Sequence, residues 1–193
     1  MAKKSNNINK ISKNRNDLVA FWSVPLPDGT YSIEFEHGTT SGKRILRING
    51  KEILRRDWMF RLVGDEIFEI GKQKAKCVLS VDPLPYFSFC YGLSVNGKPL
   101  EKFTEKQNKN LKVWIVTAAD KEKYRIVLEK QNLNVWINGN LQETINTFID
   151  NGTEIRFKVD DFDGVIKATS ATKKGLVYEL YGNGQLIPDE NEF

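Results

Sequence analysis

Four sequence landmarks occur twice in this chain, in the same order and about ninety residues apart. Each copy has a strand-like run, an Asn-Gly pair, a Gly-x-Glu-Ile motif and a second Asn-Gly pair. The first set lies at 32–36, 49–50, 64–67 and 96–97, and the second at 125–129, 138–139, 152–155 and 183–184. This period exceeds the roughly 20–50 residues of solenoid repeats but suffices for a small domain with its own core. We therefore expect two tandem copies of one domain.

Alternation of apolar and polar residues dominates both copies, as in Tyr31–Phe35, Tyr124–Leu128 and Ile155–Val159. This period of two is typical of half-buried strands. The Asn-Gly pairs supply the positive φ angles that two-residue hairpin turns need. No segment shows an apolar stripe of helical period and helix length. The predicted fold is all-β, with two tandem antiparallel β-sandwich domains related by internal duplication.

The expected domain limits follow from changes in composition. Residues 17–103 form the first predicted sandwich domain and residues 112–190 the second. Between them, 104–111 is predicted as a linker, because ten of the twelve residues from Glu101 to Lys112 are polar and show no alternation. Residues 1–16 are rich in Lys, Asn and Ser and are predicted to form a disordered basic tail.

The net charge of +4 comes from that tail rather than from the domains. Residues 1–16 contain five basic and no acidic residues, whereas residues 17–193 contain 24 basic and 25 acidic ones. The folded part is thus nearly neutral. Nucleic acid is therefore an unlikely partner, and binding through the basic tail is kept only as a minor hypothesis.

The tail has no apolar segment of the kind found in secretory signals. No apolar run approaches the roughly 18 residues that a membrane span needs. We therefore expect a soluble, cytoplasmic protein without membrane insertion.

Strand alternation places Cys77 on an apolar face with Leu79, whereas Cys90 lies opposite Phe89 and Tyr91. Side chains on opposite faces of a sheet cannot form a disulfide, so two reduced thiols are predicted, with a structural role for Cys77. The four tryptophans, Trp22, Trp58, Trp114 and Trp136, are each expected in a core, because an aromatic side chain buries a large apolar area.

Residues 33–44, followed by Asn49-Gly50-Lys51-Glu52 and by 58–64, closely resemble the Fas apoptotic inhibitory molecule family. The second copy matches through 125–130, Val135-Trp136, Asn138-Gly139 and 150–154. The resemblance covers about residues 17–190. It implies a two-domain, all-β cytosolic protein without enzymatic activity, associated with protection from death-receptor-triggered apoptosis and from stress-induced protein aggregation.

The hairpin between the strands at 32–36 and 44–48 is four residues longer than its counterpart in the second copy. The extra length indicates either an elaborated hairpin or a loop kept for a partner. Its candidate partner-binding residues are His37, Thr39, Thr40, Ser41, Lys43 and Arg44. Their hydroxyls and cations would suit an anion or a phosphorylated segment, although the spacing is not that of a nucleotide-binding loop.

No set of residues predicts catalysis, a metal or a cofactor. His37 is the single histidine, and Ser41 is too close to it along a tight loop to complete a triad. A zinc site would need both cysteines and His37 to converge with a fourth ligand. The acidic run at 160–164 lacks the glutamate of a calcium loop and is predicted to be a turn.

Three hypotheses follow, and the first is preferred. The chain is a non-enzymatic protein-binding protein whose partners are death-receptor signalling components or misfolded clients, with the first copy as the binding half. The alternative is a phosphopeptide- or small-anion-binding module using the 37–44 hairpin. The third is nucleic-acid binding through the tail.

Overall fold

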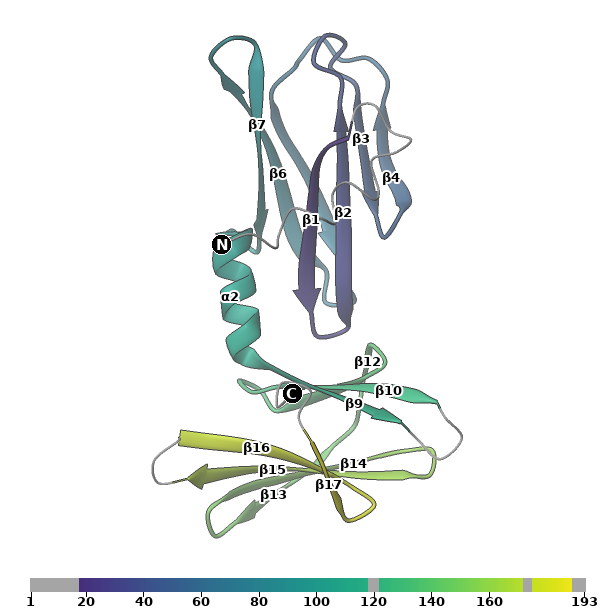
Figure 1. Ribbon diagram of the computed structural model, residues 1–193, viewed down its shortest axis with the longest axis vertical. Helices are drawn as coiled ribbons and strands as arrows, with labels where there is room; N and C mark the ends of the chain where they lie inside the picture. The colour runs from purple at the N-terminus through teal and green to yellow at the C-terminus, as the bar shows by residue number, and fades with distance from the viewer. Residues whose placement is uncertain (1–17, 118–121, 172–174, 189–193) are drawn as a thin grey trace. The chain divides into compact units, whose positions relative to one another are not determined.

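The computed structural model describes residues 18–117, 122–171 and 175–188 (Figure 1). The basic tail predicted for residues 1–16 lies outside these ranges. The chain divides into two compact units, and apart from residues 27–29, which are grouped with the second unit, the division falls between Glu105 and Lys106, inside helix α2 (Leu100–Asn110). Strands dominate both units, so the all-β prediction is confirmed.

The first unit consists of two antiparallel sheets, each formed by strands in sequence order. Buried side chains from both sheets, among them Phe35, Leu46, Leu79 and Val95, form one core between them. The unit is therefore a β-sandwich. Its first sheet contains β1 (Leu18–Leu26), β2 (Gly29–His37), β3 (Arg44–Ile48) and β4 (Lys51–Arg56), and its second contains β5 (Gly64–Ile70), β6 (Ala75–Leu84), β7 (Ser88–Val95) and β8 (Lys98–Pro99).

The second unit repeats this plan, and Trp114, Ile126, Ile155 and Leu180 are buried in its core. Its first sheet contains β9 (Leu111–Thr117), β10 (Lys123–Glu129), β11 (Asn134–Ile137) and β12 (Asn140–Leu141). Its second sheet has the order β13 (Ile145–Ile149), β14 (Gly152–Val159), β15 (Phe162–Ala171), β16 (Gly175–Gly182) and β17 (Gln185–Ile187).

The repeated Asn-Gly pairs form the same turn in both units. Each asparagine has φ between 47° and 50°, and each following glycine between 73° and 81°. The carboxamide oxygen of each asparagine also accepts a hydrogen bond from a backbone N–H of a neighbouring strand. These asparagines are Asn49, Asn96, Asn138 and Asn183, and their donors are Ser32, Lys76, Arg125 and Asp163. The shared topology and turns agree with internal duplication, which stays an inference.

Helix α2 occupies most of the segment from Glu101 to Lys112, so the loop expected there is wrong, while the linker at 104–111 stays a prediction. Its glutamates, lysines and glutamine favour a helix, and Glu101 and Lys109 lie at the ends where the helix dipole favours their charges. Phe103 alone is buried, in the core of the first unit. A single buried residue does not produce an apolar stripe of helical period, so the periodicity of the sequence did not predict this helix.

Within the described residues, no helix has the length and apolar character needed to cross a membrane.

The two cysteines lie as predicted. Cys77 is buried in the first core and Cys90 is exposed, and both are free thiols. Burial raises the pKa of the Cys77 thiol to about 11, which keeps it protonated at neutral pH. The turn predicted for the acidic run is formed by Asp160 and Asp161, between β14 and β15, and residues 162–164 begin β15.

Candidate functional site

The long hairpin between β2 and β3 has a fixed structure at one end of the first unit. The Gly38 N–H donates to the Lys43 carbonyl at 2.9 Å, and the Gly42 N–H donates to the Gly38 carbonyl at 2.8 Å. The Met59 N–H donates to the Ser41 carbonyl at 3.0 Å, which joins the hairpin to the segment 57–63 between β4 and β5. The hairpin is thus held by main-chain contacts to itself and to that segment.

His37 ends β2 and is buried beneath this hairpin. Its Nδ1 lies 2.9 Å from the Tyr91 hydroxyl oxygen, and the Phe89 ring meets the imidazole edge-on at a centroid distance of 4.9 Å. Burial, followed by the nearby Arg44 charge, lowers the pKa of His37, while the Leu62 backbone acts in the opposite direction. The imidazole is therefore neutral at pH 7 and part of an aromatic cluster.

Arg44 begins β3 opposite His37 and is only 1% exposed. Its Nη1 lies 2.9 Å from Glu66 Oε1 and donates to the Gly64 carbonyl at 3.2 Å. Arg56 contacts the other oxygen of the same carboxylate at 3.4 Å. The guanidinium therefore forms an internal ion pair, because a buried charge needs a partner of opposite sign.

The remaining candidates of the hairpin lie nearer the surface. Lys43 Nζ is 3.6 Å from Glu36 Oε2, and the Glu36 carboxylate also pairs with Arg47. The Ser41 hydroxyl accepts a hydrogen bond from the Lys43 N–H at 3.2 Å. Thr39 and Thr40 are exposed.

The structure thus gathers all six predicted residues in one hairpin, but it directs both cations towards the protein's own carboxylates. Of the six, only Thr39 and Thr40 are exposed. The geometry lends no support to anion or phosphopeptide binding, and the binding role of these residues stays a prediction.

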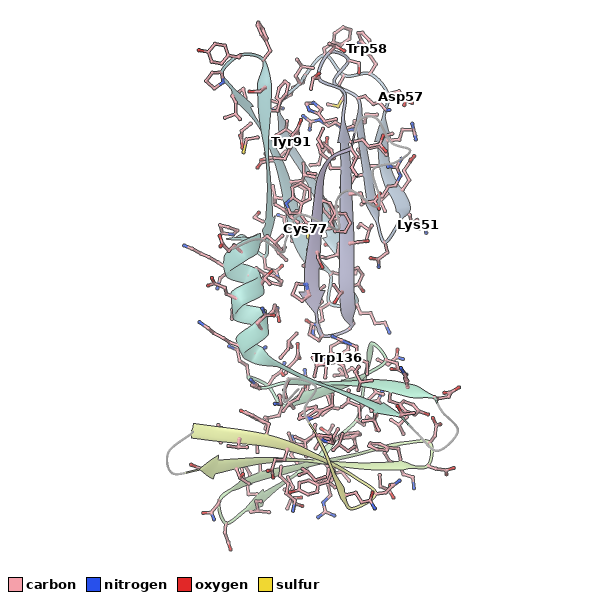
Figure 2. The ribbon with its side chains drawn as sticks, in the orientation of Figure 1. Lys51, Asp57, Trp58, Cys77, Tyr91 and Trp136 are labelled. Carbon is pink, nitrogen blue, oxygen red and sulfur yellow. The ribbon has the colours of Figure 1, made fainter. Side chains whose placement is uncertain are left out.

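The same end of the unit exposes four aromatic side chains that the sequence did not single out as a surface. The hairpin joining β6 to β7 reaches this end, because Phe89 and Tyr91 of β7 contact His37. Figures 1 and 2 show that hairpin and the segment with Trp58 at the same end. The exposed fractions are 68% for Trp58, 100% for Phe60, and 97% for both Tyr86 and Phe87. We call these four residues the aromatic surface.

The core position expected for Trp58 is therefore wrong. Trp114 is buried in the second core as expected, and Trp22 packs partly buried against the first core. Trp136 is buried but does not belong to the second core, because it points to the other face of β11 from Val135 and Ile137. Trp58 differs because it follows the end of β4, in a segment without strand pairing, so no opposing sheet covers it. For Tyr86 and Phe87, the sequence did indicate an exposed position, because Pro83 and Pro85 mark a turn directly before them.

Tyr86 and Phe87 are held in a backbone conformation that bulky residues rarely adopt. Their φ angles are 64° and 57°, in the left-handed region. The Ser88 hydroxyl donates to the Pro85 carbonyl at 2.7 Å across this turn. A left-handed L-residue costs about 1–2 kcal/mol, and such strain is concentrated at functional sites. The turn therefore displays two rings at a cost in stability.

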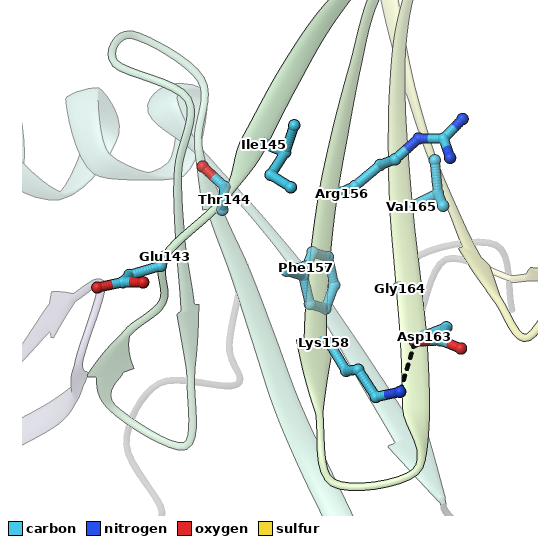
Figure 3. A pocket seen from close by; sticks show the side chains of 9 residues that line it. All are labelled: Glu143, Thr144, Ile145, Arg156, Phe157, Lys158, Asp163, Gly164 and Val165. Atoms are coloured by element: carbon cyan, nitrogen blue, oxygen red, sulfur yellow. Dashed lines mark ion pairs between the residues drawn. The ribbon is translucent and has the colours of Figure 1, made fainter.

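The second unit contains an open hollow of about 690 Å³ at the start of β13 (Figure 3). Ile145, Phe157 and Val165 contribute its apolar lining, and Arg156 and Lys158 its cations. Lys158 pairs with Asp163 at 3.6 Å. Among the described residues, no group of three or more His, Cys, Asp or Glu side chains could hold a metal ion.

The fold and the aromatic surface define a class of protein with two all-β units, one of which exposes four aromatic residues at one end. The chain belongs to the Fas apoptotic inhibitory molecule (FAIM1) family, which matches residues 18–190 and confirms the resemblance seen in the sequence.

Its relatives include Fas apoptotic inhibitory molecule 1 from three mammals. The Bos taurus protein is 45% identical over 175 residues, covering 90% of this chain and 87% of the relative. The Homo sapiens protein is also 45% identical over 175 residues, covering 90% of this chain and 97% of the relative. The Mus musculus protein is 44% identical with the same coverage as the human one.

Proposed function

We propose that this chain is a non-enzymatic, cytoplasmic protein-binding protein that restrains Fas-triggered apoptosis and also limits aggregation of misfolded proteins. The names of its relatives support the anti-apoptotic role. The structural observation that supports binding is the aromatic surface, two members of which occupy a strained turn. The partners are signalling proteins or misfolded clients.

The aromatic surface has the composition of a binding hot spot. Trp, Tyr, Phe, Met and Arg are enriched at protein interfaces, and the run Trp58-Met59-Phe60-Arg61 combines four of these types. Large aromatic side chains bury much area on binding and lose little conformational entropy. Truncation of a central hot-spot residue typically costs about 2 kcal/mol or more of binding free energy.

The local contacts of His37 and Ser41 support a non-enzymatic role. The imidazole is buried against Tyr91 and Phe89, and the Ser41 hydroxyl accepts from a backbone N–H instead of facing the histidine. A nucleophile and its base need a direct hydrogen bond. The two side chains are therefore structural in this proposal.

The test compares the intact chain with a variant that combines Trp58→Ala, Phe60→Ala, Tyr86→Ala and Phe87→Ala. Both are expressed at equal levels in cells that die on Fas stimulation, and caspase activation is measured. Wild type should reduce caspase activation, and the variant should not. A control with Leu176→Ala and Leu186→Ala, two exposed leucines of the second unit, should behave as wild type.

Absence of protection by wild type would overturn the anti-apoptotic proposal. Full protection by the aromatic variant would instead remove the aromatic surface as the binding site. Aggregation protection is measured separately, as light scattering from a heat-sensitive client enzyme mixed with the purified chain. Unchanged scattering at equimolar wild type would overturn that part of the proposal.

A further inference from the structure

Strand β13 is an addition that the first unit lacks. In the first unit, the strand with the Gly-x-Glu-Ile motif, β5, lies at the edge of its sheet. In the second unit the matching strand is β14, and β13 pairs along its outer side from Ile145↔Arg156 to Ile149↔Gly152. Within the described ranges no strand pairs with the other side of β13. In the second unit, β13 is therefore the edge strand of this sheet, in a position that no strand occupies in the first unit.

Edge strand β13 lacks the charges, the proline and the very short length that protect the other edge strands from pairing with further strands. Natural edge strands are shielded by charges, by proline or by being short. β4 contains four charged residues and β5 three, whereas β1 contains Pro25 and β9 contains Lys112. β8, β12 and β17 have only two or three residues. β13 reads Ile-Asn-Thr-Phe-Ile, with neither charge nor proline over five residues.

The hydrogen-bond pattern shows which backbone groups of β13 face outward. The Ser170 N–H donates to the Asn151 carbonyl at 2.9 Å, so odd-numbered residues at this end of β14 bond towards β15. Because the two kinds of antiparallel pair alternate, even-numbered residues of β14 bond towards β13, and their partners there are odd-numbered. The N–H and C=O groups of Asn146 and Phe148 therefore point to the free edge.

Side-chain exposure agrees with an uncovered edge. Phe148 is 90% exposed although its register with Thr153 puts it on the same face as buried Ile155. Ile145 is 71% exposed and lines the hollow of Figure 3 on the other face. An added strand would cover apolar surface on both faces and satisfy the outward backbone groups.

We propose that β13 binds extended apolar segments of non-native polypeptides by strand addition, an inference that rests on the aggregation protection in the proposed function. Backbone hydrogen bonds supply affinity in this mode and depend little on sequence, which suits varied clients. An uncharged edge does not select clients by charge.

A second copy of the chain fits this edge less well. Five paired residues span about 17 Å, so a contact limited to two β13 strands falls short of the roughly 1,200–2,000 Å² that a stable dimer buries. Weak, reversible contact with a client strand needs no such area.

The test measures binding of a short fluorescent peptide of alternating valine and threonine to the full-length chain by anisotropy. Asn146→Pro removes an outward N–H without touching the bonds to β14, and Phe148→Lys places a charge on the edge. Each should weaken binding about tenfold or more. The matched control Ile67→Lys changes an exposed isoleucine of β5 and should leave binding unchanged. Circular dichroism checks that all variants fold.

A peptide methylated at successive backbone nitrogens should bind weakly, because neither of its edges can then complete the ladder. Equal binding of that peptide, or of both β13 variants, would overturn the inference. Failure of any peptide to bind, together with a wild-type dimer that Asn146→Pro dissociates in sedimentation, would overturn it in favour of self-association.

Client light scattering separates this inference from the proposed function. Suppression by wild type and by both β13 variants alike leaves aggregation protection standing and removes β13 as its site. If the variants abolish peptide binding but wild type does not suppress client aggregation, β13 stands as a strand-binding site and aggregation protection is overturned.

Discussion

His37 and Tyr91 connect the two sheets of the first unit, with 2.9 Å between the imidazole Nδ1 and the hydroxyl oxygen. His37 ends β2 in one sheet, and Tyr91 lies in β7 of the other. The contact therefore fixes the hairpin that joins β6 to β7 relative to the long hairpin that follows β2. Because the pKa of His37 is lowered mainly by burial, this connection depends on pH.

Acidification is expected to destabilise the first unit through His37. A base whose pKa is lower in the folded state than in the unfolded state takes up its proton more readily when the protein is unfolded, so protonation favours unfolding. Its contribution to stability is complete above the unfolded pKa of about 6.5 and is lost as the pH falls from there through the folded pKa. Urea unfolding between neutral and mildly acidic pH should show this loss. In His37→Gln, which does not titrate, that part of the slope should disappear, and an unchanged slope would contradict the assignment.

Removal of Glu66 should be among the most destabilising single changes in the first unit. Glu66→Ala leaves the buried guanidinium of Arg44 without its carboxylate, which costs about 3–5 kcal/mol when a buried pair is broken. Arg156→Ala, which breaks the exposed pair with Glu154, is the control and should change stability far less. Urea midpoints give both values. Similar losses for the two variants would show that the Arg44–Glu66 pair is not desolvated.

Gly42→Ala should destabilise the long hairpin more than an equivalent change at another left-handed glycine. Gly42 has φ of +70°, and a Cβ there would lie 2.5 Å from the Met59 carbonyl oxygen. Gly97 has φ of +73° with open space around it, so Gly97→Ala carries only the conformational cost of about 1 kcal/mol. The difference between the two unfolding free energies measures the contact with Met59. Equal values would mean that the segment 57–63 is not held against the hairpin.

Relief of the strained aromatic turn should raise stability and reduce binding. Tyr86→Asn with Phe87→Gly places residues that accept positive φ at the two left-handed positions. The gain should be about 1–2 kcal/mol, seen as a higher melting temperature. The same variant should lose protection in the Fas assay. A variant that is no more stable would contradict the strain, and one that keeps full protection would contradict the role of the rings.

Some of the site was predictable from the sequence and some was not. The long hairpin was found because its length could be compared with the second copy. Its two cations were expected to suit an anion or a phosphorylated segment, yet Arg44 is buried against Glu66, which lies 22 positions further along the chain. The aromatic surface was missed because Trp58 and Phe60 belong to an irregular segment, where no periodicity distinguishes exposed from buried side chains.

The sequence alone determined the all-β class, the Asn-Gly turns and the opposite facing of Cys77 and Cys90. These depend on alternation and on backbone preferences of adjacent residues, which are local properties. The tertiary structure decided which side chains are covered. Phe103 anchors a helix in a polar segment, and Phe148 is exposed at an unpaired edge. Burial depends on elements distant in the chain, so the residues beside a side chain do not specify its exposure.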